Sequence, residues 1–227
     1  MGNPPVTRAT VLISGEGSNL QAIIDATDSI LSHLKIVRVI SNRAKVNGIK
    51  RAHAAGIPTA YHNLISGKYQ AAGEKNKDVR DAARYKYDQD LSRLILADNP
   101  HIVICAGFMH VLTPIFLESM KEREIPVINL HPALHGRYDG TNAIQRAFDD
   151  FQAGKLANNK TGVMIHYVIG EVDRGEVIIQ REVECQIEET LHEFENRMHS
   201  IEHQLIVEGT VLAIEKIWNR KNELEIS

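Results

Sequence analysis

Short apolar runs alternate with longer amphipathic stretches along the first 130 residues of the chain. The apolar runs cover residues 9–14, 35–41, 101–105 and 126–130. They are apolar almost throughout, which is typical of parallel strands covered on both faces. Helical patterns fall near residues 18–29, 46–55, 79–98 and 113–121. The alternation predicts βαβ units, and hence an α/β fold with a doubly wound, mostly parallel sheet and helices on both of its faces.

The pattern changes after residue 160. Here "GVMIHYVIG" and "EVIIQREVEC" flank the tight connection "EVDRG" and predict an antiparallel strand pair. A long amphipathic stretch from Leu191 to Trp218 predicts a C-terminal helix, whereas the polar residues 63–83 predict a long loop or a frayed helix start. The chain shows no repeat and no linker. We therefore expect one domain over residues 1–227, with a flexible segment at residues 1–8.

Composition and charge narrow the class of protein. The 227 residues are 43% apolar and 24% charged, and the net charge of −3 argues against nucleic acid as a main partner. No apolar run approaches the roughly 20 residues of a membrane span, and the first residues lack the apolar core of a secretory signal. We expect a cytoplasmic protein that binds neither nucleic acid nor membrane and is a monomer or a weak homodimer.

The sequence "VLISGEGSNLQAIIDA", residues 11–26, runs from an apolar strand through glycines into a helix. A dinucleotide fingerprint would place a third glycine where Leu20 or Gln21 stands, and no Gly-Lys-Ser/Thr follows for a nucleoside triphosphate. What remains is a helix N-terminus, with Ser18 or Asn19 as its cap, that suits one small anion. A plain strand-to-helix turn that needs glycine is the alternative. Glu16 places a negative charge close to the proposed anion.

The stretch "VINLHPALHGRYDG", residues 127–140, carries the strongest chemical signal. Asn129 and His131 are two positions apart at the end of a strand, so their side chains project to the same face, and Pro132 ends the strand. An amide and an imidazole side by side can both donate to an oxygen that gains negative charge. Asp173, in the turn between the last two strands, could orient the histidine. The alternatives are an Asn that closes a turn, a packed histidine and a turn aspartate bonded to its own backbone.

Nothing in the sequence has the spacing of a metal site. His131 and His135 are four residues apart, but Pro132 and Gly136 exclude one helix face for both. No HExxH motif and no Cys/His set occurs among the 11 histidines. Cys105 lies inside the apolar run "HIVICAG" and is expected to be a buried core thiol. We therefore expect no metal.

Four stretches together resemble one known family. The stretches "VLISGEGSNLQAIIDA", "ICAGFMHVLTP", "INLHPAL" and "HYVIGEVDRGEVIIQ" are similar to those of the phosphoribosylglycinamide formyltransferases, and the likeness runs from about residue 9 to residue 217. Asn-x-His-Pro with a downstream Asp is shared by the wider group that uses 10-formyltetrahydrofolate. The "SGxGSNLQA" loop is more specific to the glycinamide ribonucleotide enzymes.

The resemblance implies a reaction in de novo purine synthesis. The amine of 5′-phosphoribosylglycinamide would attack the formyl carbon of 10-formyltetrahydrofolate, which acts as co-substrate. Asn129 and His131 would stabilise the oxyanion of the tetrahedral intermediate, and Asp173 would orient His131 and assist proton transfer. The N-terminal half would bind the nucleotide phosphate, and the C-terminal half would bind folate and carry catalysis.

The resemblance also implies binding residues. The ribonucleotide contacts would come from Gly17, Ser18, Asn19, Glu202 and His199. The folate contacts would come from Arg84, Met109, His110, Val111, Leu112 and Asn129. An arginine suits the carboxylates of a folate glutamate tail because it can bind them through two parallel hydrogen bonds. For Arg84 and His199 a solvated surface role is the alternative, and His166 either lines the site or packs in the sheet.

The chain departs from the common family pattern at three places. It reads "HPALHG" where many members read "HPSLLP", it has His110 where arginine is common, and Glu16 replaces a small polar residue. Two related enzymes and a binding protein are the competing interpretations. Methionyl-tRNA formyltransferase would add a basic C-terminal domain and formyltetrahydrofolate deformylase an N-terminal regulatory domain, and we expect neither here. A non-catalytic nucleotide sensor would have no reason to place Asn129, His131 and Asp173 together.

Overall fold

The computed structural model describes residues 5–226, with side chains up to residue 223. Two compact units divide the chain, Met1–Val127 and Ile128–Ser227. The strands follow the order β3-β2-β1-β4-β5-β6-β7 in a seven-stranded mixed sheet. The α/β class, the mostly parallel sheet, the antiparallel pairing near the C-terminus and the long final helix are thereby confirmed.

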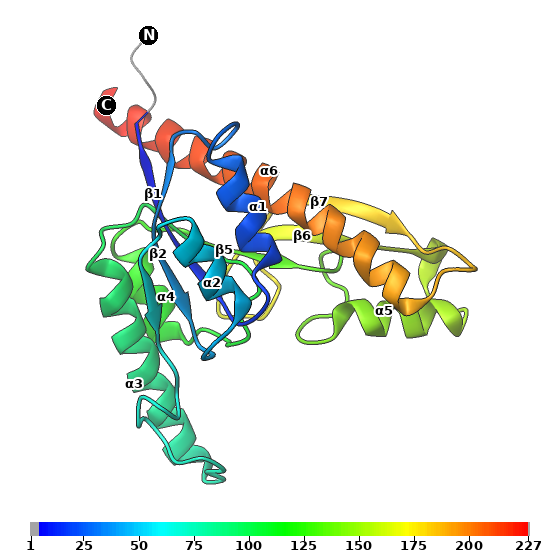
Figure 1. Ribbon diagram of the computed structural model, residues 1–227, viewed down its shortest axis with the longest axis horizontal. Coiled ribbons are helices and arrows are strands. Elements are labelled where there is room, and N and C mark those ends of the chain that lie inside the picture. The colour runs from blue at the N-terminus through cyan, green and yellow to red at the C-terminus, as the bar shows by residue number, and fades with distance from the viewer. Residues whose placement is uncertain (1–4, 227) are drawn as a thin grey trace. The chain divides into compact units, whose positions relative to one another are not determined.

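The N-terminal unit is built of consecutive βαβ units (Figure 1). Its parallel strands are β1 (Thr7–Ile13), β2 (Leu34–Ser41), β3 (Thr59–Tyr61) and β4 (Ile102–Cys105). Its helices are α1 (Ser18–Ala26), α2 (Asn47–Ala54), α3 (Lys77–Leu96) and α4 (Pro114–Lys121). The chain adds β2 and β3 on one side of β1 and then returns to add β4 on the other. Because such crossovers are right-handed, α1 and α2 cover one face of these strands and α3 covers the other.

Burial explains why β1 and β4 read as unbroken apolar runs. Every residue of β4 is buried, and Val11, Leu12 and Ile13 of β1 have no exposed surface. Helices pack against both faces of such strands, so no position along them reaches water. β1 begins at Thr7, two residues before its apolar run. Thr7 is therefore also fully buried, and it pairs with Leu34 of β2.

The C-terminal unit is built on antiparallel pairing. Its strands are β5 (Val127–His131), β6 (Lys160–Tyr167) and β7 (Val177–Glu184). Its helices are α5 (Ala143–Gln152), the single 3-10 turn η1 (Ala157–Asn159) and α6 (Leu191–Ile226). In Figure 1, α6 runs along β6 and β7, against which it packs. Gly209 of α6 allows this approach, because a Cβ there would lie 2.7 Å from Cγ1 of Ile165 on β6.

The structure corrects several details of the expected elements. Three elements, β3, α5 and the turn η1, were not predicted, and α6 extends eight residues beyond the expected end at Trp218. Within the segment expected to be flexible, residues 7 and 8 form the start of β1, whereas residues 1–4 lie outside the described part of the chain. The polar stretch 63–83 is a loop only as far as Asn76, which caps α3 by accepting from the backbone N–H of Asp78. No helix within residues 5–226 is long and apolar enough to cross a membrane.

Candidate active site

The end of β5 brings together the three side chains that the sequence singled out. His131 and Asp173 are buried, and Nδ1 of His131 lies 3.3 Å from Oδ2 of Asp173. The half-buried Asn129 donates from Nδ2 to Oδ1 of Asp173 at 3.3 Å. The spacing of two along β5 puts the amide and the imidazole on one face, and the connection between β6 and β7 brings the carboxylate to them.

His166 on β6 is a fourth member of this cluster. It pairs with Asn129 across the antiparallel strands, and its Nε2 lies 3.2 Å from Nδ2 of Asn129 and 3.5 Å from Oδ1 of Asp173. The backbone carbonyl of Tyr167 lies 2.9 Å from the other ring nitrogen, Nδ1, and accepts a hydrogen bond from its N–H. Neutral His166 therefore accepts from the amide at Nε2, whereas protonated His166 directs an N–H at the carboxylate.

A backbone contact holds the remaining side of Asp173. The N–H of Gly140 donates to Oδ2 at 2.8 Å, which is the shortest of the described contacts to this carboxylate. The backbone of Asp173 has a positive φ of 56°, a conformation that residues with a Cβ seldom adopt. The strained backbone and the Gly140 contact together aim the carboxylate into the cluster rather than toward its own turn.

Burial and charge set the protonation states of the pair. Burial lowers the pKa of His131 below its ordinary value of 6.5, against the opposing pull of the Asp173 charge. Burial raises the pKa of Asp173, but the contacts with His166 and with the Gly140 N–H outweigh it and hold this pKa below 3.8. Near neutral pH the pair is thus a neutral imidazole beside a carboxylate.

The second ring nitrogen of His131, Nε2, is the atom of the cluster that can accept a proton. Because Asp173 can only accept, Nδ1 of His131 carries the proton and Nε2 of the neutral ring carries a lone pair. Nε2 is buried and has no hydrogen-bond partner among the described residues. A buried polar atom left in this state is costly unless a substrate group meets it. The arrangement can accept a proton at Nε2 while the carboxylate stabilises the resulting positive charge.

The predicted phosphate loop joins β1 to α1 in the N-terminal unit. Gly17 is the N-cap of α1, with a φ of 73°, and no side chain caps this helix. The expected cap at Ser18 or Asn19 is therefore wrong, because both already belong to the first turn of the helix. Gly17 also packs against Gly48 of α2, whose Cα would lie 2.5 Å from a Cβ on Gly17. The uncapped helix start agrees with an anion that binds the backbone N–H groups.

Glu16 does not leave an open negative charge beside this loop. Its carboxylate accepts from Arg51 at 2.7 Å and from the amide of Asn47 at 2.7 Å, both of which lie on α2. The hydrogen bonds from Asn47 and Arg51 lower the pKa of Glu16. The departure from the small residue that is common here is thus compensated by a neighbouring cation.

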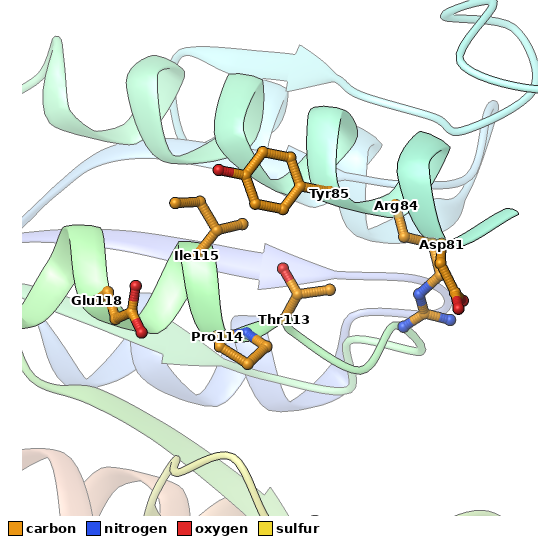
Figure 2. Close-up of a pocket in the computed structure, with 7 residues that line it drawn as sticks. All are labelled: Asp81, Arg84, Tyr85, Thr113, Pro114, Ile115 and Glu118. Atoms are coloured by element: carbon orange, nitrogen blue, oxygen red, sulfur yellow. The ribbon is translucent and has the colours of Figure 1, made fainter. Parts of the chain in front are cut away.

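The predicted folate residues of the N-terminal unit lie on α3 and on the loop that follows β4. Arg84 of α3 donates from Nη2 to the backbone carbonyl of Val111 at 2.7 Å. The loop leaves the side chains of Met109 and Val111 largely exposed, whereas Leu112 is buried. Arg84 lines a pocket between α3 and the start of α4 (Figure 2), and the volume of this pocket is about 380 Å³. The residues that line it are Asp81, Arg84, Tyr85, Thr113, Pro114, Ile115 and Glu118.

Two further predicted residues lie one turn apart on α6. Glu202 is 5% exposed, whereas His199 lies on the exposed side of the helix. The two side chains thus differ in their exposure to water, and the ribonucleotide contact of each stays a prediction.

Comparisons with known proteins identify the family of the chain. Residues 7–210 match the family model described as "Formyl transferase". The phosphoribosylglycinamide formyltransferase of Schizosaccharomyces pombe is 42% identical over 90% of this chain and 95% of its own length. The chain belongs to the phosphoribosylglycinamide formyltransferases. These are folate-dependent enzymes of purine biosynthesis that take the formyl group from 10-formyltetrahydrofolate, so the enzyme class expected from the sequence is confirmed.

Other phosphoribosylglycinamide formyltransferases support the same family assignment. The Saccharomyces cerevisiae protein is 40% identical over 93% of this chain and 99% of its own length. Among solved structures, the Coxiella burnetii enzyme is 33% identical, has a TM-score of 0.74, and matches over 92% of this chain and 86% of its own. The Symbiobacterium toebii enzyme has a TM-score of 0.76 at 26% identity and covers 93% of this chain and 89% of its own.

Two contacts of this phosphoribosylglycinamide formyltransferase could not be predicted from its sequence. The Gly140 N–H holds the carboxylate of Asp173, and Asp88 of α3 binds the loop after β4. A backbone N–H leaves no trace in the sequence. Asp88 stands in the quoted stretch "RYKYDQDL" among other charged residues, and only its complete burial distinguishes it.

Proposed function

We propose that the Asn129, His131 and Asp173 cluster performs formyl transfer by direct attack. The amine nitrogen of phosphoribosylglycinamide bonds to the formyl carbon, and the carbonyl electrons move onto its oxygen. The amine loses a proton, the bond to the folate nitrogen breaks, and that nitrogen leaves with a proton. The observation that carries the proposal is the buried His131 ring, whose Nδ1 lies 3.3 Å from a carboxylate oxygen and whose Nε2 has no hydrogen-bond partner among the described residues.

Each residue has a distinct part in this scheme. Nε2 of neutral His131 takes the proton of the attacking amine. The resulting imidazolium faces the oxyanion and then donates this proton to the leaving folate nitrogen. The Asp173 carboxylate holds the ring and stabilises its positive charge. The N–H contacts of Asn129 to His166 and Asp173 are long, at 3.2 and 3.3 Å, so an oxyanion can compete for one of them. One such donor is typically worth about 3–4 kcal/mol of the barrier.

The binding residues extend the proposal. The backbone N–H groups at Gly17, Ser18 and Asn19 hold the 5′-phosphate, for which the uncapped start of α1 is suited. Glu202 accepts from ribose hydroxyls, with His199 adding positive charge. Arg84 and residues 109–112 hold the folate. The scheme uses no metal, and we place the protein in the cytoplasm as a monomer or weak homodimer.

A formyl-transfer assay tests the proposal. Purified protein is mixed with phosphoribosylglycinamide and 10-formyltetrahydrofolate, and release of the deformylated folate is followed by absorbance. We expect release that depends on the ribonucleotide and that collapses in Asp173→Asn. Release without the ribonucleotide would indicate a deformylase. Ribonucleotide binding without any release would favour a nucleotide sensor.

A further inference from the structure

Asp88 is the most deeply buried carboxylate for which hydrogen-bond partners are described. Its side chain has no exposed surface, and it lies on α3, facing the loop of residues 107–113. One oxygen, Oδ1, lies 2.7 Å from Nε2 of His110, and the other, Oδ2, accepts from the backbone N–H of Thr113 at 2.6 Å. Both partners belong to that loop. A carboxylate removed from water in this way is costly unless such partners are held in place.

Two other contacts hold the same loop. Arg84, one helical turn before Asp88 and therefore on the same face of α3, donates to the carbonyl of Val111 at 2.7 Å. The N–H of Met109 donates to Oγ of Ser14 at the end of β1, at 2.6 Å. Backbone contacts at positions 109, 111 and 113, together with the side-chain contact of His110, thus hold most of the loop, which turns at Gly107 with a φ of 80°.

The anchored loop presents two apolar side chains to solvent. Met109 is 60% exposed and Val111 is 51% exposed, although both stand next to tightly bound backbone groups. The His110 ring is instead turned inward against Tyr87, with ring centroids 4.8 Å apart. Helix α3 therefore decides which side chains of the loop point in and which point out. A loop that holds exposed apolar groups in one fixed arrangement is organised for a ligand with a flat apolar part.

We propose that Asp88 is a positioning residue for folate, one that holds the 107–113 loop in its binding conformation before the folate arrives. The inference rests on the proposed role of residues 109–112 in folate binding. Preorganisation strengthens binding by removing the cost of ordering the loop, so its loss weakens folate binding and leaves the chemical step intact. Arg84 has the same function through Val111, and its remaining N–H groups stay available to a folate carboxylate.

Three variants separate positioning from mere stability. Asp88→Ala removes both hydrogen bonds and should raise the KM for 10-formyltetrahydrofolate about 10-fold or more, with kcat and the ribonucleotide KM changed less than about threefold. Asp88→Asn should restore most of the folate affinity. Its amide oxygen accepts from Thr113, and its NH₂ donates to His110, whose neutral ring can accept at Nε2. Asp90→Asn is the matched control, because that α3 carboxylate binds Tyr69 and Arg93 instead of the loop.

A fourth variant covers the case in which Asp88→Ala does not fold. His110→Phe keeps a ring beside Tyr87 and removes one partner of Asp88, and it should raise the folate KM in the same selective way. An unchanged folate KM, or a loss shared equally by all kinetic constants, would overturn the inference. Failure of the proposed function has a different signature, because the wild-type protein itself would then show no ribonucleotide-dependent transfer.

Discussion

Gly17 offers a graded test of the loop between β1 and α1. Alanine at this position would destabilise the fold in two ways. It would adopt a left-handed backbone with a φ of 73°, and its Cβ would lie 2.5 Å from the Cα of Gly48. The backbone conformation costs about 1–2 kcal/mol for a residue with a Cβ. The forced separation of α1 from α2 adds about 1–3 kcal/mol, as overpacking typically does. We expect Gly17→Ala to lower the free energy of unfolding by about 2–5 kcal/mol.

Two other glycines separate these penalties. Gly15 has no positive φ and nothing within 4 Å of a built Cβ, whereas Gly56 has a φ of 67° and equally open space. Urea unfolding should therefore give three different losses in the free energy of unfolding. Gly15→Ala should be close to neutral, Gly56→Ala should lose the backbone contribution alone, and Gly17→Ala should lose both contributions. The KM for the ribonucleotide should rise in Gly17→Ala alone. If Gly17→Ala were no more destabilising than Gly56→Ala, the close approach of α1 and α2 would be refuted.

Three further predictions use other parts of the molecule. The pKa of His131 is lowered below 6.5 by folding, so below this pH the unfolded chain binds a proton at His131 more readily than the folded chain does. The contribution of His131 to stability is therefore present above pH 6.5 and is lost as the pH falls. Urea titrations should accordingly show less acid destabilisation between about pH 7 and 5 in His131→Ala than in the wild type. Gly209→Ala should cost about 1–3 kcal/mol of stability by pushing α6 off Ile165, and Ile165→Ala in the same chain should recover part of that loss. Burial raises the pKa of the Cys105 thiol to about 12, so a thiol reagent at pH 8 should modify this residue only after denaturant is added.

The fold could be predicted where burial leaves a pattern. Strands β1, β2 and β4 of the N-terminal unit are buried along most of their length, so they read as apolar runs. β3 was missed because it has three residues, none of them buried. α5 was missed although its apolar residues Ala143, Ala147 and Phe148 recur at helical spacing, so an amphipathic helix could have been predicted there.

The site could be predicted where local spacing decides the geometry. Asn129 and His131 share a face of β5 because side chains alternate along a strand, and the structure agrees. The contacts of Asp173 with Gly140 and of Asp88 with the 107–113 loop depend on where distant loops come to lie. Their donors include backbone N–H groups, which every residue but proline has, so no residue type indicates them.

Whether His131 acts in the chemical step is decided by comparing the rate of that step with the affinity for the ribonucleotide. The single-turnover rate of formyl transfer and the Kd for phosphoribosylglycinamide are measured in the wild type and in His131→Ala. We expect the rate to fall at least about 100-fold while the Kd changes less than about threefold, because the Nε2 contact gains its strength only as charge develops. A comparable loss of rate and of affinity would contradict the account and make His131 a structural residue.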